Sequence, residues 1–205
     1  MTRPYVVVHT AVSLDGATTG YEPDVGRFYA LARTWNEDVT LTGADTILAQ
    51  QAALAAVPRP GPAAGGPLLA VVDGRHRVEA WAALRDCGHW RDVVALRATA
   101  ADGRVDLARA LAMLAERHGA RTVRVDSGGG LSGALLARGL VDEVSLLVHP
   151  VVAGTAGDRR WQGPGPLPPV ALVRIAAEPL DGGLVWLRFA VERGSGMHRR
   201  QPHRP

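Results

Sequence analysis

Lysine is absent from this sequence, cysteine occurs once, and long apolar runs are missing. All 23 basic residues are arginine, which excludes Schiff-base lysine catalysis and a Walker-type phosphate loop, because both need a lysine amine. The single cysteine, Cys87, excludes an internal disulfide and a zinc site built from several thiolates. No apolar stretch approaches the ~20 residues that cross a bilayer. We therefore expect a soluble protein with no membrane partner.

Positive charge in excess of negative charge is confined to the C-terminus. Residues 194–205 hold three arginines and no acid, whereas the rest of the chain holds 20 arginines and 20 acidic residues. A nucleic-acid-binding protein carries its charge as a patch on the fold. The distribution predicts a disordered basic tail at 194–205 and no nucleic-acid partner. The lone cysteine, and the early acids and glycine after the short apolar run 5–8, favour a cytoplasmic protein without a signal peptide.

Short β-branched runs alternate with segments of helical periodicity along most of the chain. The expected strands are 5–12, 39–42, 68–72, 92–96, 122–125 and 143–149, and the expected helices are 27–35, 107–117 and 131–138. Asp106 is placed to cap the second of these helices, and Gly139 to end the third. The alternation predicts an α/β fold with a mainly parallel central sheet and helices on both faces.

The C-terminal part differs in pattern. Runs 170–177 and 184–191 are separated by a short turn-rich segment, which favours an antiparallel hairpin at the edge of the sheet. Segment 57–67 is rich in Pro, Gly and Ala, but the strands before it are too few to close a core of their own. We interpret it as a surface loop, so the sequence predicts a single domain over 1–193.

A glycine-rich turn, Asp126–Gly133, separates an expected strand from an expected helix. Gly128, Gly130 and Gly133 have the G-x-G-x-x-G spacing, in which missing side chains let the backbone approach a diphosphate at a helix N-terminus. This interpretation predicts that Gly129→Val abolishes cofactor binding. The alternative is a tight strand-to-helix turn that binds nothing. The usual dinucleotide fold has its fingerprint at the first strand, and here the turn follows about the fifth, which excludes an ordinary Rossmann domain.

A second turn follows another expected strand. Gly43 permits close backbone approach, and the hydroxyl of Thr46 could meet a phosphate near a helix start. Ligands bind at the carboxyl edge of open α/β sheets, so we expect both turns to lie together at that edge. If the ligand is a dinucleotide that also carries a 2′-phosphate, an arginine fork would suit that phosphate, and Arg75 and Arg97, each just past a strand, are the candidates.

Five motifs, in order between about residues 3 and 191, resemble the reductase domain of bifunctional riboflavin-biosynthesis deaminase/reductase proteins and their stand-alone relatives. The motifs are Ser13-Leu14-Asp15-Gly16, Thr42-Gly43-Ala44-Asp45-Thr46, Val72-Asp73-Gly74-Arg75-His76-Arg77-Val78, Asp126-Ser127-Gly128-Gly129-Gly130-Leu131 and Gly139-Leu140-Val141-Asp142-Glu143-Val144-Ser145. The resemblance implies a dihydrofolate-reductase-like fold and a homodimer built along sheet edges. The zinc deaminase of the bifunctional proteins needs cysteines that this chain lacks.

The resemblance also implies a reaction and a site. The family transfers hydride from NADPH to C1′ of the ring-opened ribosylamino group of 5-amino-6-(5-phosphoribosylamino)uracil. Asp126 stands where the family usually has a glutamate that contacts the substrate, and would be catalytic; Leu54 would also contact the substrate. The cofactor residues would be Ala11, Ser13, Gly43, Thr46, Gly74, Arg75, Gly128, Gly129, Gly130, Leu131, Ser132 and Gly133. No metal site is expected.

The chain departs from the family pattern around the expected substrate site. Gln50 and Gln51 stand where the family usually has two acids, and an amide cannot act as a general acid. The loop 19–28 is also shorter than in the family. Two alternatives therefore stay open: an NADPH reductase of the same fold acting on a pterin or another imine or carbonyl compound, and a nucleotide-binding module without turnover.

Overall fold

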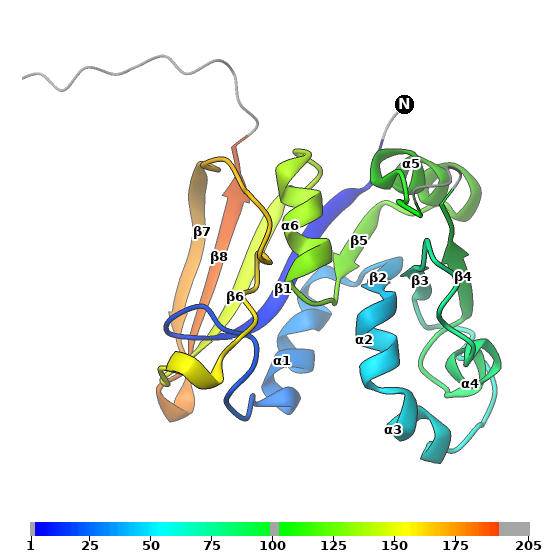
Figure 1. Ribbon diagram of the computed structural model, residues 1–205, viewed down its shortest axis with the longest axis horizontal. Coiled ribbons are helices and arrows are strands. Elements are labelled where there is room, and N and C mark those ends of the chain that lie inside the picture. Colours follow the sequence, from blue (N-terminus) through cyan, green and yellow to red (C-terminus); the bar gives the residue numbers. More distant parts are fainter. Residues whose placement is uncertain (1–2, 99–102, 193–205) are drawn as a thin grey trace, which may run out of the picture.

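One α/β domain forms around a single eight-stranded sheet (Figure 1). The computed structural model describes residues 3–98 and 103–192. Its strands are β1 (Tyr5–Ser13), β2 (Val39–Gly43), β3 (Leu68–Val72), β4 (Asp92–Leu96), β5 (Thr122–Val125), β6 (Glu143–His149), β7 (Leu172–Pro179) and β8 (Val185–Val191). Its helices are α1 (Val25–Ala32), α2 (Ala44–Ala49), α3 (Gln51–Ala56), α4 (Trp81–Asp86), α5 (Leu107–His118) and α6 (Gly129–Ala137), with single 3₁₀ turns η1 (Arg33–Trp35), η2 (Gly154–Ala156) and η3 (Asp181–Gly183).

The strand order is β4-β3-β2-β5-β1-β6-β8-β7. Strands β1 to β6 pair in parallel, and β8 pairs antiparallel with both β6 and β7. The β7–β8 hairpin closes one end of the sheet and β4 the other (Figure 1). This confirms the mainly parallel sheet with an antiparallel C-terminal hairpin. All six parallel strands leave their carboxyl ends on one edge, which positions the site described below.

Helices cover both faces of the sheet, because side chains alternate along each buried strand. In β3, Leu68 and Ala70 belong to a cluster with residues of α5 and α6. Leu69 and Val71 point the other way and pack with residues of α2 and α4. A strand covered on both faces has no polar side, and the continuously apolar run of β3 reflects that position.

Helix ends follow the expected capping chemistry. The Asp106 side chain accepts a hydrogen bond from the Arg109 amide at the start of α5, and Gly139 follows α6 with a φ of 63°. The start of α6 differs from the expectation: it begins at Gly129, not Leu131. Glycine has a low intrinsic helix propensity, and here packing against a distant loop overrides it. The helices α3 and α4 were not expected, and the tail at 194–205 lies outside the described residues.

Among the described residues, no helix combines the length and apolarity that a membrane crossing needs.

Candidate functional site

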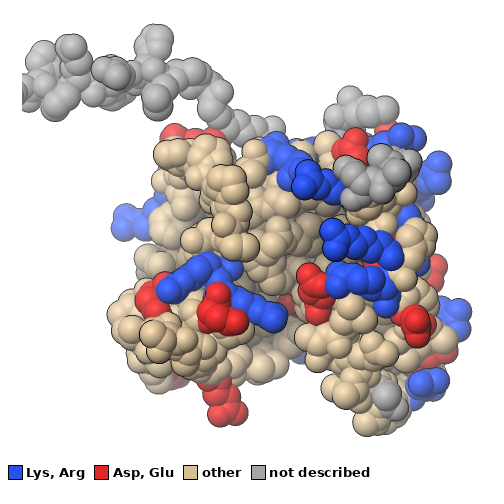
Figure 2. Space-filling view, in the orientation of Figure 1, with Lys and Arg blue, Asp and Glu red and all other residues tan. Residues whose placement is uncertain are grey.

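A cleft of about 1190 Å³ opens over the carboxyl ends of β1, β2, β3 and β5. Residues of the glycine turn, the turn after β2, the loop after β3 and the loop 158–164 form its walls. On the face shown in Figure 2, arginine side chains lie on both sides of the hollow. The position agrees with the rule that ligands of open α/β sheets bind at this edge.

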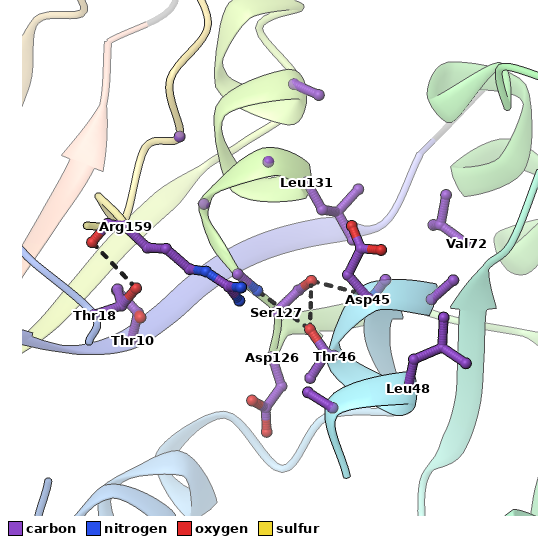
Figure 3. Close-up of a pocket in the computed structure, with 18 of the residues that line it drawn as sticks. Thr10, Thr18, Asp45, Thr46, Leu48, Val72, Asp126, Ser127, Leu131 and Arg159 are labelled. Carbon is purple, nitrogen blue, oxygen red and sulfur yellow. Dashed lines mark hydrogen bonds between the residues drawn. The ribbon is translucent and has the colours of Figure 1, made fainter. Parts of the chain in front are cut away.

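Ser127 joins the two turns that the sequence singles out. Its hydroxyl accepts a hydrogen bond from the Gly43 amide at 3.1 Å and lies 3.3 Å from the Thr46 hydroxyl (Figure 3). The Thr46 hydroxyl in turn accepts from the Gly128 amide at 3.4 Å. The two turns therefore lie together at the carboxyl edge, as expected, and Ser127 fixes their spacing.

The glycines of the turn divide into two pairs. A Cβ built on Gly128 or Gly130 would meet no atom within 4 Å, and both residues line the cleft. A Cβ on Gly129 would overlap the Arg160 carbonyl, and one on Gly133 the Gln162 carbonyl. Gly128 and Gly130 thus leave the cleft floor open, whereas Gly129 and Gly133 let a loop pack on α6. The expected effect of Gly129→Val changes accordingly, since its side chain would meet protein backbone first.

That loop, residues 153–163, is called the strap below. Hydrogen bonds fasten it to the loop that follows β1 and begins at Leu14. The Asp15 carboxylate accepts hydrogen bonds from the amides of Ala153 at 3.0 Å and Gly154 at 3.1 Å, and the Thr18 amide donates to the Arg159 carbonyl at 2.8 Å. Hydrogen bonds from the Ser13 hydroxyl and the Ala153 amide hold the pKa of Asp15 well below its usual range. An ionised Asp15 therefore ties the two loops together.

Arginines line both ends of the cleft. Arg75, Arg77 and Arg104 lie toward β3, and Arg159 and Arg160 project from the strap. Arg77 pairs with Asp45 at 2.7 Å. A guanidinium fork matches the oxygens of a phosphate group, so both ends of the cleft can hold anions.

The two arginines expected for a 2′-phosphate have different places. Arg75 lines the cleft. Arg97 instead pairs with the buried Asp73 at 2.7 Å and lies over the Trp81 ring, 5.2 Å from its centroid. The structure brings Arg75, but not Arg97, to the other candidates.

Asp126 is held at the cleft wall by a buried arginine. Arg124, only 3% exposed, donates to Glu37 at 2.7 Å and to Asp126 at 3.0 Å. Burial by itself would lower the pKa of Arg124, but the carboxylates of Asp126 and Glu37 raise it above the usual value. Burial, and then the neighbouring Asp126 carboxylate, raise the pKa of Tyr29. The site therefore presents an oriented carboxylate beside a neutral phenol.

The remaining expected site residues fall into two groups. Ala11, Gly74 and Leu131 line the cleft together with Gly43, Thr46, Asp126 and the first three glycines of the turn. Ser13 and Ser132 are 1% exposed and do not line it. Leu54 packs against the apolar cluster of α2 and α4.

Several cleft residues were not found from the sequence. Arg159 and Arg160 lie in a segment without regular structure, and Tyr29 lies on α1; no motif in the sequence marks these three residues. His9 lines the cleft but is satisfied within the fold, with its ring nitrogens 2.9 Å from the Ser145 hydroxyl and 3.1 Å from the Phe28 carbonyl. Within residues 3–98 and 103–192, no group of three His, Cys, Asp or Glu side chains is arranged to hold a metal ion.

Comparison with protein families gives one match: residues 4–184 correspond to the RibD C-terminal domain. No curated protein sequence matches the chain.

Solved structures with the same fold include three whose names refer to reductases or to RibD. Acinetobacter baumannii RibD has a TM-score of 0.72 and 19% identity over 93% of this chain, which spans only 58% of that protein. A pyrimidine reductase-like protein from Corynebacterium diphtheriae has a TM-score of 0.62 and 16% identity, with 93% of each chain covered. The riboflavin biosynthesis reductase Rib7 of Saccharomyces cerevisiae has a TM-score of 0.58 and 18% identity, covering 93% of this chain and 90% of that one. These identities show the fold that the proteins share.

Proposed function

Since this chain belongs to the RibD C-terminal domain family, we propose that it is an NADPH-dependent reductase of riboflavin biosynthesis. The proposed substrate is 5-amino-6-(5-phosphoribosylamino)uracil, with hydride transferred to C1′ of its ring-opened ribosylamino group. The similar solved structures carry names from riboflavin biosynthesis or pyrimidine reduction. This chain, however, spans only 58% of the Acinetobacter baumannii RibD protein. The assignment of cofactor and substrate therefore rests on the cleft.

One observation carries the proposal. Ser127 contacts both Gly43 and Thr46 and so holds the two turns together, and the glycine turn leaves open space in the cleft above it. Gly128 and Gly130 face open space in the cleft, and any side chain at these positions would reduce the room for a ligand. The first amides of α6 have no partner within the helix, and they carry the positive end of its dipole. A diphosphate fits this floor. Arg75, farther along the same cleft, would pair with the 2′-phosphate that distinguishes NADPH from NADH.

Bound NADPH would supply the hydride, and the residues of this chain would bind, orient and manage the proton. Arg124 holds one oxygen of Asp126, and a side-chain hydrogen bond joins Asp126 to Tyr29. The carboxylate that these two residues orient would accept a hydrogen bond from a substrate amine or hydroxyl, and Tyr29, whose pKa is raised, stays protonated near neutral pH. Hydride transfer needs little else beyond placing the two reacting carbons in contact.

One observation favours a second candidate, a reductase of the same fold with another substrate. Gln50 lines the cleft, where the family usually has an acid, so that position offers an amide and no ionisable group. A substrate that needs only neutral hydrogen bonding at that wall, such as a pterin or another imine, suits it equally. The non-catalytic alternative would leave Asp126 and its buried arginine without a chemical role.

A homodimer in the cytoplasm belongs to the same proposal. The edge strand β7 exposes Leu172, Val173 and Ile175 by 40% to 50%, and an exposed apolar edge strand invites pairing with another chain. Ile175→Asp should convert the dimer to a monomer, as measured by light scattering coupled to size-exclusion chromatography. A wild-type protein that elutes as a monomer would contradict this part of the proposal.

Thermal unfolding with and without cofactor tests the proposed function first. NADPH at a hundred times its dissociation constant should stabilise the protein by about 2.7 kcal/mol, and NADH by less at equal concentration. Oxidation of NADPH in the presence of the ribosylamino-pyrimidine phosphate, followed at 340 nm, then tests the substrate. No stabilisation by either cofactor would contradict the reductase assignment. Binding without turnover of this pyrimidine would favour the second candidate.

A further inference from the structure

We infer that Arg159 of the strap is a second phosphate-binding residue of the cleft, which holds the diphosphate of the dinucleotide from the side opposite the glycine turn. This inference rests on the proposed function, because it requires a dinucleotide in the cleft. It adds a residue that neither the turn nor Arg75 accounts for, from a segment with no recognisable motif.

The strap holds the backbone of Arg159 in a fixed place. The Arg159 carbonyl accepts from the Thr18 amide at 2.8 Å, and its own amide donates to the Thr19 hydroxyl at 3.3 Å. The next residue, Arg160, donates to the Asp15 carbonyl and packs its own carbonyl against Gly129. A backbone fastened on both sides loses little further entropy when its side chain binds a ligand.

The Arg159 side chain points from the strap across the cleft toward Ser127 at the glycine turn (Figure 3). Gly128 and Gly130, which leave the floor open, lie on the same turn. A diphosphate resting on that open floor would thus have the guanidinium on its exposed side. The Arg159 guanidinium therefore lies near the middle of the cleft, whereas Arg75 lies toward β3.

Two other arginines of the cleft, Arg160 and Arg77, are already paired with acids, whereas Arg159 is not within the described residues. Arg160 lies 3.4 Å from the Asp15 carboxylate, and Arg77 pairs with Asp45. Asp158, the nearest acid along the strap, accepts from the Thr19 hydroxyl at 2.7 Å. Within the part of the chain that the structure describes, no ion pair involves the guanidinium of Arg159. Its charge and its fork of donors are available to phosphate oxygens.

Two ligand fragments separate the two ends of the cleft. 2′-Phospho-ADP-ribose carries the diphosphate and the 2′-phosphate, and 2′-AMP carries the 2′-phosphate alone. Dissociation constants for both, and for NADPH, would be measured by titration calorimetry in the wild type, Arg159→Gln and Arg159→Lys. Arg109→Gln, which removes the same charge from an exposed position on α5 outside the cleft, is the matched control.

We expect Arg159→Gln to weaken NADPH and 2′-phospho-ADP-ribose about tenfold, the usual effect of losing a charge-assisted hydrogen bond, and to leave 2′-AMP unchanged. Arg159→Lys should recover part of the loss, and Arg109→Gln should lose nothing. Equal binding of NADPH by the wild type and Arg159→Gln would overturn the inference. So would a loss of 2′-AMP affinity as large as that of NADPH. Failure of the wild type itself to bind NADPH would instead contradict the proposed function.

Discussion

Gly129 lies directly against the backbone carbonyl of Arg160, so closely that a Cβ on Gly129 would overlap it. Gly133, one turn along α6, lies in the same way against the Gln162 carbonyl. Gly163 completes the contact from the strap side. Its φ is 76°, and a Cβ added to it would lie 2.6 Å from the Gly129 carbonyl oxygen. Two glycines of a turn that resembles a nucleotide motif therefore serve the packing of the strap.

Gly129→Ala should destabilise the protein by about 1–3 kcal/mol, because the strap must shift to make room for the added methyl group. Gly130→Ala is the matched control: it adds the same methyl group to the same helix, where nothing lies within 4 Å. Its stability should be unchanged, or higher by up to about 1 kcal/mol from helix propensity. Urea unfolding followed by circular dichroism measures both. Equal stability of the two variants would contradict this packing role.

Arg124→Met should destabilise the protein by about 3 kcal/mol or more. The substitution removes the partner of Glu37 and Asp126, and Glu37 has a side chain only 11% exposed, so an uncompensated carboxylate would stay buried. Adding Glu37→Gln to Arg124→Met should restore part of the lost stability, since the second charge is then gone. Urea unfolding of the four proteins in this double-mutant cycle gives the coupling. Strictly additive effects would show that the pair is not coupled.

Local signals in the sequence were enough to predict where the strands of the sheet lie. The β3 strand is a continuously apolar run bounded by turn residues, and its expected bounds, Leu68–Val72, are those of the structure. Likewise the sequence predicts Asp106 as a cap, because a capping side chain bonds an amide only three residues along the chain. Such contacts depend on residues close together in the chain, and short-range chemistry determines them.

Long-range contacts account for what was missed. The α6 helix begins at Gly129, and the strap, about thirty residues later, packs against it there. The strap itself has little regular structure, and its hydrogen bonds run to the loop after β1, which lies far away in the sequence. Pattern and propensity carry no information about such pairs. The two turns could be placed together, because both follow strands of one parallel sheet, but Arg159 could not.

Arg75→Gln should weaken NADPH binding about tenfold and leave NADH binding unchanged, because only NADPH has the 2′-phosphate that Arg75 would pair with. Arg97→Gln is the control: Arg97 pairs with Asp73, so its loss should not change the ratio of the two affinities. Fluorescence titration with each cofactor measures that ratio. A ratio that changes in Arg97→Gln and not in Arg75→Gln would contradict the assignment.

The buried His9 should make the free energy of unfolding fall in mild acid. Burial lowers the pKa of its imidazole to about 4, below the usual 6.5 that it regains on unfolding. Between these values the unfolded chain binds the proton and the folded chain does not, so stability is present above pH 6.5 and falls as the pH falls. From pH 7 to pH 4.5 the loss should be about 2–3 kcal/mol.

His9→Phe keeps the ring stack on Phe28, whose centroid lies 4.4 Å away, but cannot titrate. Its free energy of unfolding should therefore depend much less on pH between 6.5 and 4.5, even if its stability at pH 7 is lower. The measurement is urea unfolding at several pH values. An identical pH dependence in both proteins would exclude His9 as the titrating group.

Asp126→Asn should lower kcat by about a hundredfold or more, the usual effect of losing a group that handles a proton, and leave the NADPH dissociation constant within about twofold. The amide keeps the shape of the carboxylate but loses its charge and its capacity to take a proton, while Glu37 still pairs with Arg124 at 2.7 Å and preserves the fold. Asp126→Glu, which places the usual family residue at this position, should retain most of the turnover. Steady-state kinetics with NADPH and the pyrimidine substrate, together with NADPH titration, measure both quantities. Full turnover in Asp126→Asn would remove Asp126 from the chemistry and leave it a partner of Arg124 alone.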